Sequence, residues 1–138
     1  GARVALERNE HLRETQHMAS DSELQAIVDR LNRENSRARA DLARAQQAAY
    51  RAACTLAARM GEEDPTLRRV VLFGSTVPGR RYRADSDIDL AVEGGDRARL
   101  ERLAASLEQS VDIVRMDELR PGILERVLAE GVVLYEAE

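Results

Sequence analysis

Apolar residues recur through the first half of the chain at alternating steps of three and four, which places them on one face of a helix. Ser20, followed three residues later by Glu23, is typical of a helix start. Neither glycine nor proline interrupts the pattern before Gly61, which we expect to cap the helix end. We therefore predict one long helix over about residues 20–60 in heptad register. Its seam is Leu24, Val28, Leu31, Asn35, Ala38, Leu42, Ala45, Ala49, Ala52 and Leu56.

The second half of the chain alternates short apolar runs with turn residues. The runs predict strands over about residues 68–74, 87–93, 111–115 and 132–136, and helical periodicity predicts helices over about 96–109 and 122–130. We expect an α+β domain over residues 66–138, with a small mixed sheet that has its helices on one face. A helical N-terminal extension over residues 1–61 precedes it, and the charged, proline-ended segment 62–65 is the expected hinge.

The charge of the chain limits the ligands that it could bind. All 21 basic residues are arginine, and the formal net charge is −4, divided as +2 over residues 1–60 and −6 over residues 61–138. An acidic second half argues against long nucleic acid as a ligand, because a phosphate backbone requires a basic surface. Aromatic residues make up only 3%, so few side chains could stack on bases.

Three features of the sequence bear on its cellular location. No uninterrupted apolar stretch approaches the roughly 20 residues that span a bilayer, and no secretory signal is recognisable at the start. The single cysteine, Cys54, cannot form a disulfide within the chain. We therefore expect a cytoplasmic protein that does not contact membranes.

The residues with a clear chemical pattern lie between 70 and 92. The apolar run that begins at Val70 stops at Gly74 and Ser75, where a glycine allows a backbone to approach phosphate closely and a serine offers a hydroxyl and an amide. Asp87 and Asp89 stand at i and i+2 on the next predicted strand, so their carboxylates share a face. Two like charges side by side need a cation, and magnesium prefers such oxygen ligands.

This pattern resembles a known family. Phe73-Gly74-Ser75, an eleven-residue loop and then Asp87-Ile88-Asp89-Leu90 are similar to the signature of the DNA polymerase β-like nucleotidyltransferases, and most of all to its minimal members. The resemblance covers residues 66–136 and implies a third carboxylate on a neighbouring strand, for which Asp112 is the candidate. It also implies that Asp87, Asp89 and Asp112 are catalytic and hold two magnesium ions.

The same resemblance implies how ATP would be held. Gly74 and Ser75 would contact the phosphates that leave as pyrophosphate. Relatives commonly carry an arginine four residues after the first glycine of the motif, where this chain has Pro78. The nearest loop arginine is Arg80, so either Arg80 contacts the triphosphate after a shift of the loop, or nucleotide affinity is reduced.

The resemblance also suggests what the enzyme acts on. Minimal nucleotidyltransferases of this kind are often antitoxins that adenylylate a tyrosine of a HEPN toxin, and the long helix could bind such a helical partner. The helix could instead form a homodimer in which Asn35 sets the register. Two other functions remain open: transfer of a nucleotide to a small molecule such as an aminoglycoside, and a non-catalytic antitoxin that binds through its helix and has a vestigial site.

Overall fold

The structure is a computed structural model that describes residues 20–138; the first 19 residues of the predicted extension lie outside the described part. The chain divides into two compact units that meet between residues 40 and 41. Helix α2 (Asp21–Glu63) contributes to both. No helix within residues 20–138 has the length and apolar character to cross a membrane.

The described part of the first unit is the beginning of helix α2. The hydroxyl of Ser20 accepts a hydrogen bond from the Glu23 amide at 3.2 Å, which satisfies one of the free amides of the first turn. This contact confirms the predicted helix start. Every residue from 20 to 41 is exposed. Among them are four large apolar side chains that are 45–49% exposed and lie at helical spacing, namely Leu24, Ile27, Val28 and Leu31.

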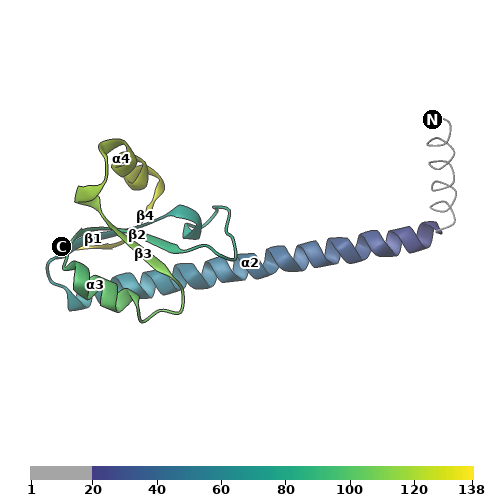
Figure 1. Cartoon of the computed structure of the whole chain (residues 1–138), viewed down its shortest axis with the longest axis horizontal. Coiled ribbons are helices and arrows are strands. Elements are labelled where there is room, and N and C mark those ends of the chain that lie inside the picture. Colours follow the sequence, from purple (N-terminus) through teal and green to yellow (C-terminus); the bar gives the residue numbers. More distant parts are fainter. Residues whose placement is uncertain (1–19) are drawn as a thin grey trace, which may run out of the picture. The chain divides into compact units, whose positions relative to one another are not determined.

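The second unit is built on a four-stranded mixed sheet (Figure 1). Its strands are β1 (Leu67–Phe73), β2 (Ile88–Gly94), β3 (Val111–Arg115) and β4 (Val132–Glu136), in the order β3-β2-β1-β4. Strand β1 pairs antiparallel with β2 and β4, whereas β2 and β3 are parallel. Helices α3 (Arg97–Ala104) and α4 (Pro121–Glu130) complete the unit, which confirms the predicted α+β class.

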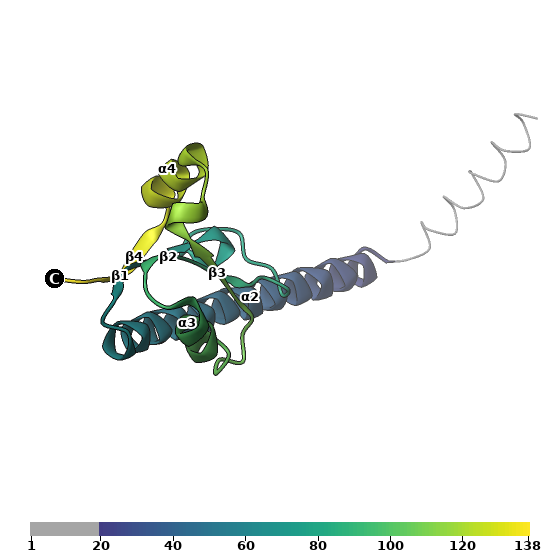
Figure 2. The ribbon, with the colours of Figure 1, turned by 60° about the vertical axis from the view of Figure 1, so that its left-hand side comes forward.

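The helices cover both faces of the sheet, which corrects the expectation that they lie on one. Side chains alternate along β1, so Val70 and Leu72 pack with α2 and α3, while Val71 and Phe73 pack with α4 on the opposite face. Because both sets are apolar, a single layer of helices would have left one set in water. Figures 1 and 2 show α4 across the sheet from α2 and α3.

The second half of α2 forms part of this core. Ala49, Ala53, Leu56, Ala57 and Met60 are buried and pack with the sheet. Three of these five residues are alanines, whose small side chains allow a helix to pack closely against its neighbours. Part of the predicted heptad seam is therefore covered by the chain itself. The compact unit begins at Asp41 and so includes the second half of α2. The domain boundary between residues 61 and 66 stays a prediction.

The predicted end of the long helix needs a correction. Gly61 is not a cap, because α2 continues to Glu63 and Gly61 does not have a positive φ. A Cβ atom at Gly61 would lie 2.2 Å from the ring of Tyr135 on β4. The glycine therefore makes room for an aromatic ring that comes from the far end of the chain.

Asp64, which the sequence placed in a hinge, is completely buried. Burial raises the pKa of its carboxyl, but hydrogen bonds from the hydroxyl and amide of Thr66 and the amide of Asp96, together with Arg99, outweigh it and lower the pKa. The ionised carboxylate thus joins the end of α2, the start of β1 and the N-terminal turn of α3. This junction is a fixed connection.

Candidate active site

Two of the predicted carboxylates lie opposite each other on neighbouring strands. Asp89 on β2 is the pairing partner of Asp112 on β3, and on its other side it pairs with Phe73 at the end of β1. Directly paired residues point to the same face of a sheet, so all three side chains share the face that α4 covers. The sequence placed Asp112 near Asp89 only through the resemblance, whereas the strand register now brings the two together.

The surroundings of Asp89 favour its neutral form. It is half-buried, whereas Asp87 and Asp112 are exposed. Burial, followed by the charges of Asp112 and Asp87, raises the pKa of the Asp89 carboxyl to about 6. Burial is the largest cause of this shift, and the two neighbouring carboxylates add to it. All three predicted acidic residues therefore influence the same point of the sheet.

The fit of these carboxylates to magnesium can be judged from their chemistry and spacing. Their oxygens are the ligands that magnesium prefers, and the raised pKa of Asp89 indicates that a cation would relieve repulsion there. Within residues 20–138, however, no three acidic, histidine or cysteine side chains are arranged closely enough to hold one metal ion. The donor set fits a hard cation, and exposed Asp87 and Asp112 are the side chains that would have to turn toward it.

Gly74 is required beside Asp89 for two reasons. Its φ of +79° lies in the left-handed region, which side chains with a Cβ rarely adopt. In addition, a Cβ atom at Gly74 would lie 2.3 Å from the Oδ2 atom of Asp89. The backbone of the predicted phosphate-binding turn therefore passes directly against the half-buried carboxylate, and Ser75 follows in the short 3₁₀ turn Gly74–Thr76.

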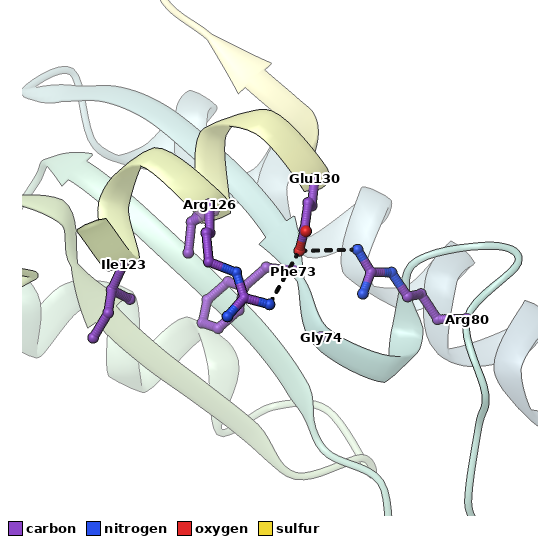
Figure 3. A pocket seen from close by; sticks show the side chains of 7 residues that line it. Phe73, Gly74, Arg80, Ile123, Arg126 and Glu130 are labelled. Carbon is purple, nitrogen blue, oxygen red and sulfur yellow. Dashed lines mark hydrogen bonds and ion pairs between the residues drawn. The ribbon is translucent and has the colours of Figure 1, made fainter. Parts of the chain in front are cut away.

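A pocket of about 250 Å³ borders Gly74 (Figure 3). Phe73, Ile123 and Val127 form its apolar lining, and Gly74 and Arg80 border it from the loop. Arg80 therefore reaches the pocket despite Pro78 at the position where relatives carry arginine. The shared sheet face of Phe73 and Asp89 places this pocket beside the carboxylates.

Glu130 at the end of α4 holds two arginines at this pocket. Nη2 of Arg80 donates to Oε2 of Glu130 at 3.2 Å, and Nη2 of Arg126 lies 3.8 Å from the same oxygen. Figure 3 shows Glu130 between the two guanidinium groups. The side chains of Arg80 and Glu130 are about half exposed and that of Arg126 is 78% exposed, so either arginine can exchange its carboxylate partner for another anion at small cost. Neither Arg126 nor Glu130 was singled out in the sequence, because a charged residue on a helix is usually just solvated.

Two residues that the sequence did not single out hold the loop between β1 and β2. The hydroxyl of Thr76, which is completely buried, donates to the Asp87 carbonyl at 3.2 Å and so links the turn to the carboxylate strand. Gln46 on α2 donates from its side-chain nitrogen to carbonyls of the loop. A threonine in a motif loop could have been suspected from its position, but nothing local marks Gln46.

Residues 58–138 match a family model described as polymerase beta, nucleotidyltransferase. No curated protein matches the chain. A solved structure of a toxin–antitoxin with AMP-PNP is 28% identical and has a TM-score of 0.51; the match covers 62% of this chain and 74% of that chain. A second structure, of a tri-AMPylated Shewanella oneidensis HEPN toxin in complex with MNT antitoxin, is 26% identical over 67% of this chain and 73% of that chain, with a TM-score of 0.45.

Proposed function

Because the chain belongs to the polymerase β nucleotidyltransferase family, we propose that it transfers AMP from ATP to a hydroxyl group of a partner protein. The observation that carries this proposal is the pairing of Asp89 with Asp112 beside the glycine turn at Gly74. The solved structure of a toxin–antitoxin with AMP-PNP, an analogue of ATP, supports the choice of nucleotide.

In the proposed reaction, the acceptor oxygen forms a bond to the α-phosphorus of ATP. The bond from that phosphorus to the oxygen bridging to the β-phosphate breaks, and pyrophosphate leaves. Asp112, which is exposed at the edge of the sheet, takes the proton of the acceptor hydroxyl. Gly74 and Ser75 contact the phosphates that leave, because the glycine allows close backbone approach there.

Asp87, Asp89 and Asp112 are the residues that would hold the two magnesium ions. Such ions, when bound, neutralise the charge of the triphosphate and of the attacking oxygen. The raised pKa of Asp89 supports this assignment, because burial and then the charges of Asp112 and Asp87 disfavour its ionised form, which a bound cation would stabilise.

The pocket beside Gly74 is the proposed place for the rest of the nucleotide. Its apolar lining of Phe73, Ile123 and Val127 suits a base, and Arg80 and Arg126 suit phosphate. A triphosphate would compete with Glu130 for both arginines. We therefore propose Arg80 as a nucleotide-binding residue and add Arg126 to it.

The proposed acceptor is a tyrosine of a HEPN toxin, and the chain would then act as an antitoxin in the cytoplasm, where ATP is available. The exposed side chains of Leu24, Ile27, Val28 and Leu31 offer an apolar face for such a partner. Four half-exposed side chains are few for a stable homodimer, which buries about 800 Å² on each subunit.

Labelled ATP tests the proposal directly. The purified chain is incubated with magnesium and α-labelled ATP, together with either the candidate toxin or a cell extract. We expect label on the toxin tyrosine, and Asp89→Asn and Asp112→Asn should each lower its rate by roughly 10²–10³-fold, the scale of losing a charge-stabilising group. Asp85→Asn, an exposed carboxylate of the preceding loop, is the matched control and should label the toxin normally.

The outcomes separate the three functions. Label on a small molecule would identify the aminoglycoside-type alternative. Binding of the toxin without any label would identify the non-catalytic antitoxin. Undiminished label in Asp89→Asn would refute the site itself. Sedimentation of the purified chain with and without the toxin shows whether the apolar face of α2 takes a toxin or a second copy.

A further inference from the structure

One side chain of helix α2 contacts three carbonyl groups of the predicted phosphate-binding loop. Nε2 of Gln46 lies 2.8 Å from the carbonyl oxygen of Ser75, 3.1 Å from that of Val77 and 2.9 Å from that of Arg80. The amide nitrogen carries two hydrogens and faces three carbonyl oxygens, so at least one hydrogen is shared between two acceptors. The contact joins residues that are 29–34 positions apart in the chain.

The loop has few other contacts on this side. A cavity of about 300 Å³ separates α2 from Pro78 and Gly79 and is lined also by Ala43, Gln47 and Tyr50. A Cβ atom at Gly79 would meet nothing within 4 Å. Val77 of the loop is buried in the core that α2 shares, but packing does not hold Pro78 and Gly79 against the helix. The hydrogen bonds of Gln46 are therefore the polar connection between the loop backbone and α2. Figures 1 and 2 both show this loop running beside α2.

The bonds also constrain Arg80 from both ends. Gln46 holds its carbonyl, while Glu130 holds its guanidinium group at the pocket beside Gly74. The Val77 carbonyl accepts from both Gln46 and the Arg80 amide, so the turn that leads to Arg80 is tied to the same point. Loss of Gln46 would release the carbonyls of Ser75 and Arg80, while Thr76 and Val77 would stay anchored by their burial.

We propose that Gln46 is a positioning residue for nucleotide binding: it holds the backbone of residues 75–80 so that Ser75 and Arg80 are arranged for phosphate before ATP arrives. This inference rests on the proposed function, because it assigns the loop to ATP. Its physical basis is preorganisation, since a loop that is already ordered loses less conformational freedom when the ligand binds.

Three variants test the proposal. Gln46→Ala removes the side chain, and Gln46→Glu keeps its size but removes both donor hydrogens. Gln47→Ala, an exposed glutamine one residue further along the same helix, is the matched control. If donation matters, Gln46→Glu should behave like Gln46→Ala; if only volume mattered, it would behave like the wild type.

Amide hydrogen exchange without nucleotide is the first measurement. The amides of Val77 and Arg80 are hydrogen-bonded within the loop. We expect them to exchange about tenfold faster in both Gln46 variants, the factor that corresponds to losing one ordinary hydrogen bond. Amides of β1 and the melting temperature should stay close to those of the wild type. Unchanged exchange in the loop would overturn the proposal, whatever the enzyme does.

Steady-state transfer from ATP is the second measurement. We expect the KM for ATP to rise about tenfold in both Gln46 variants with kcat changed less, and Gln47→Ala to leave both constants unchanged. Faster loop exchange with an unchanged KM would overturn the link to nucleotide. A wild-type chain that transfers no AMP would refute the proposed function instead, while the exchange experiment would still decide whether Gln46 holds the loop.

Discussion

At the scale of single residues, Asp89 shows how the fold creates unusual chemistry. Half-burial and two neighbouring carboxylates raise the pKa of its carboxyl to about 6, from an ordinary value of 3.8. The folded state therefore binds this proton more tightly than the unfolded chain does. The resulting contribution to stability is complete below about pH 4 and is lost as the pH rises to about 6. At neutral pH the ionised Asp89 carboxylate therefore destabilises the folded state.

Replacement of Asp89 by asparagine should remove that cost. We expect Asp89→Asn to melt roughly 2–5 °C higher than the wild type at pH 8, a modest gain because the half-buried carboxyl is partly screened by water. At pH 4 the difference should vanish. Thermal melts across this pH range measure it, and magnesium should raise the melting temperature at pH 8 in the wild type more than in the variant.

The control for this experiment is Asp85→Asn, which removes an exposed carboxylate from the loop before β2. Its melting temperature should follow that of the wild type at every pH. If Asp89→Asn also follows the wild type, or is less stable at pH 8, then the carboxylates do not repel one another as described.

At the scale of elements, the packing of helix α2 depends on the positions of its small residues. Ala53 and Ala57 are completely buried, and Gly61 lies under the ring of Tyr135. Helix propensity alone would favour replacing Gly61, because glycine inside a helix is about 1 kcal/mol less favourable than alanine. Packing against β4 opposes that preference, and the distances indicate that packing prevails.

We therefore expect Gly61→Ala to destabilise the protein. The new methyl group would lie 2.2 Å from Cε2 of Tyr135, and overpacking of this kind costs about 1–3 kcal/mol, more than the gain in helix propensity. Denaturant unfolding measures the net change, for which we expect a loss of about 1 kcal/mol, the middle of the difference between these two effects. Gly122→Ala on α4 is the control, because a Cβ atom there meets nothing within 4 Å. A Gly61→Ala protein as stable as the Gly122→Ala protein would contradict this view of the contact.

At the scale of the whole molecule, the compact unit and the predicted domain differ in extent. The compact unit begins at Asp41, so residues 41–63 of α2 form part of its core. The predicted domain over residues 66–138 lacks the five buried side chains of α2. Without them, one face of the sheet retains only the short helix α3 as cover.

Two truncated chains test whether the folding unit begins at residue 41 or at residue 66. We expect residues 41–138 to unfold cooperatively at nearly the melting temperature of the full chain, and residues 66–138 to show no cooperative transition. A domain of about 70 residues whose sheet has an uncovered apolar face is too small to be stable. Circular dichroism melts of both chains test this, and a cooperative transition in residues 66–138 would show that α2 is dispensable for folding.

Local patterns in the sequence were sufficient to predict the helices and strands, although α3 ends at Ala104 and not near residue 109. The heptad steps predicted the long helix, apolar runs predicted the four strands, and Gly74 with Asp87 and Asp89 indicated the site. Each of these signals lies within a few residues, where periodicity and turn chemistry act directly. The resemblance to a family added Asp112, which no local signal connects to the other two.

The tertiary structure decided what depends on residues far apart in the chain. It placed α4 on the second face of the sheet, buried Asp64, set Gly61 against Tyr135 and brought Gln46 to the loop. The raised pKa of Asp89 is of the same kind, since it follows from burial and from a strand more than 20 residues later. Helix periodicity, strand alternation and turns are determined by residues that are neighbours in sequence. Side-chain contacts and electrostatic effects on pKa depend on residues that are neighbours in space, and only folding brings those together.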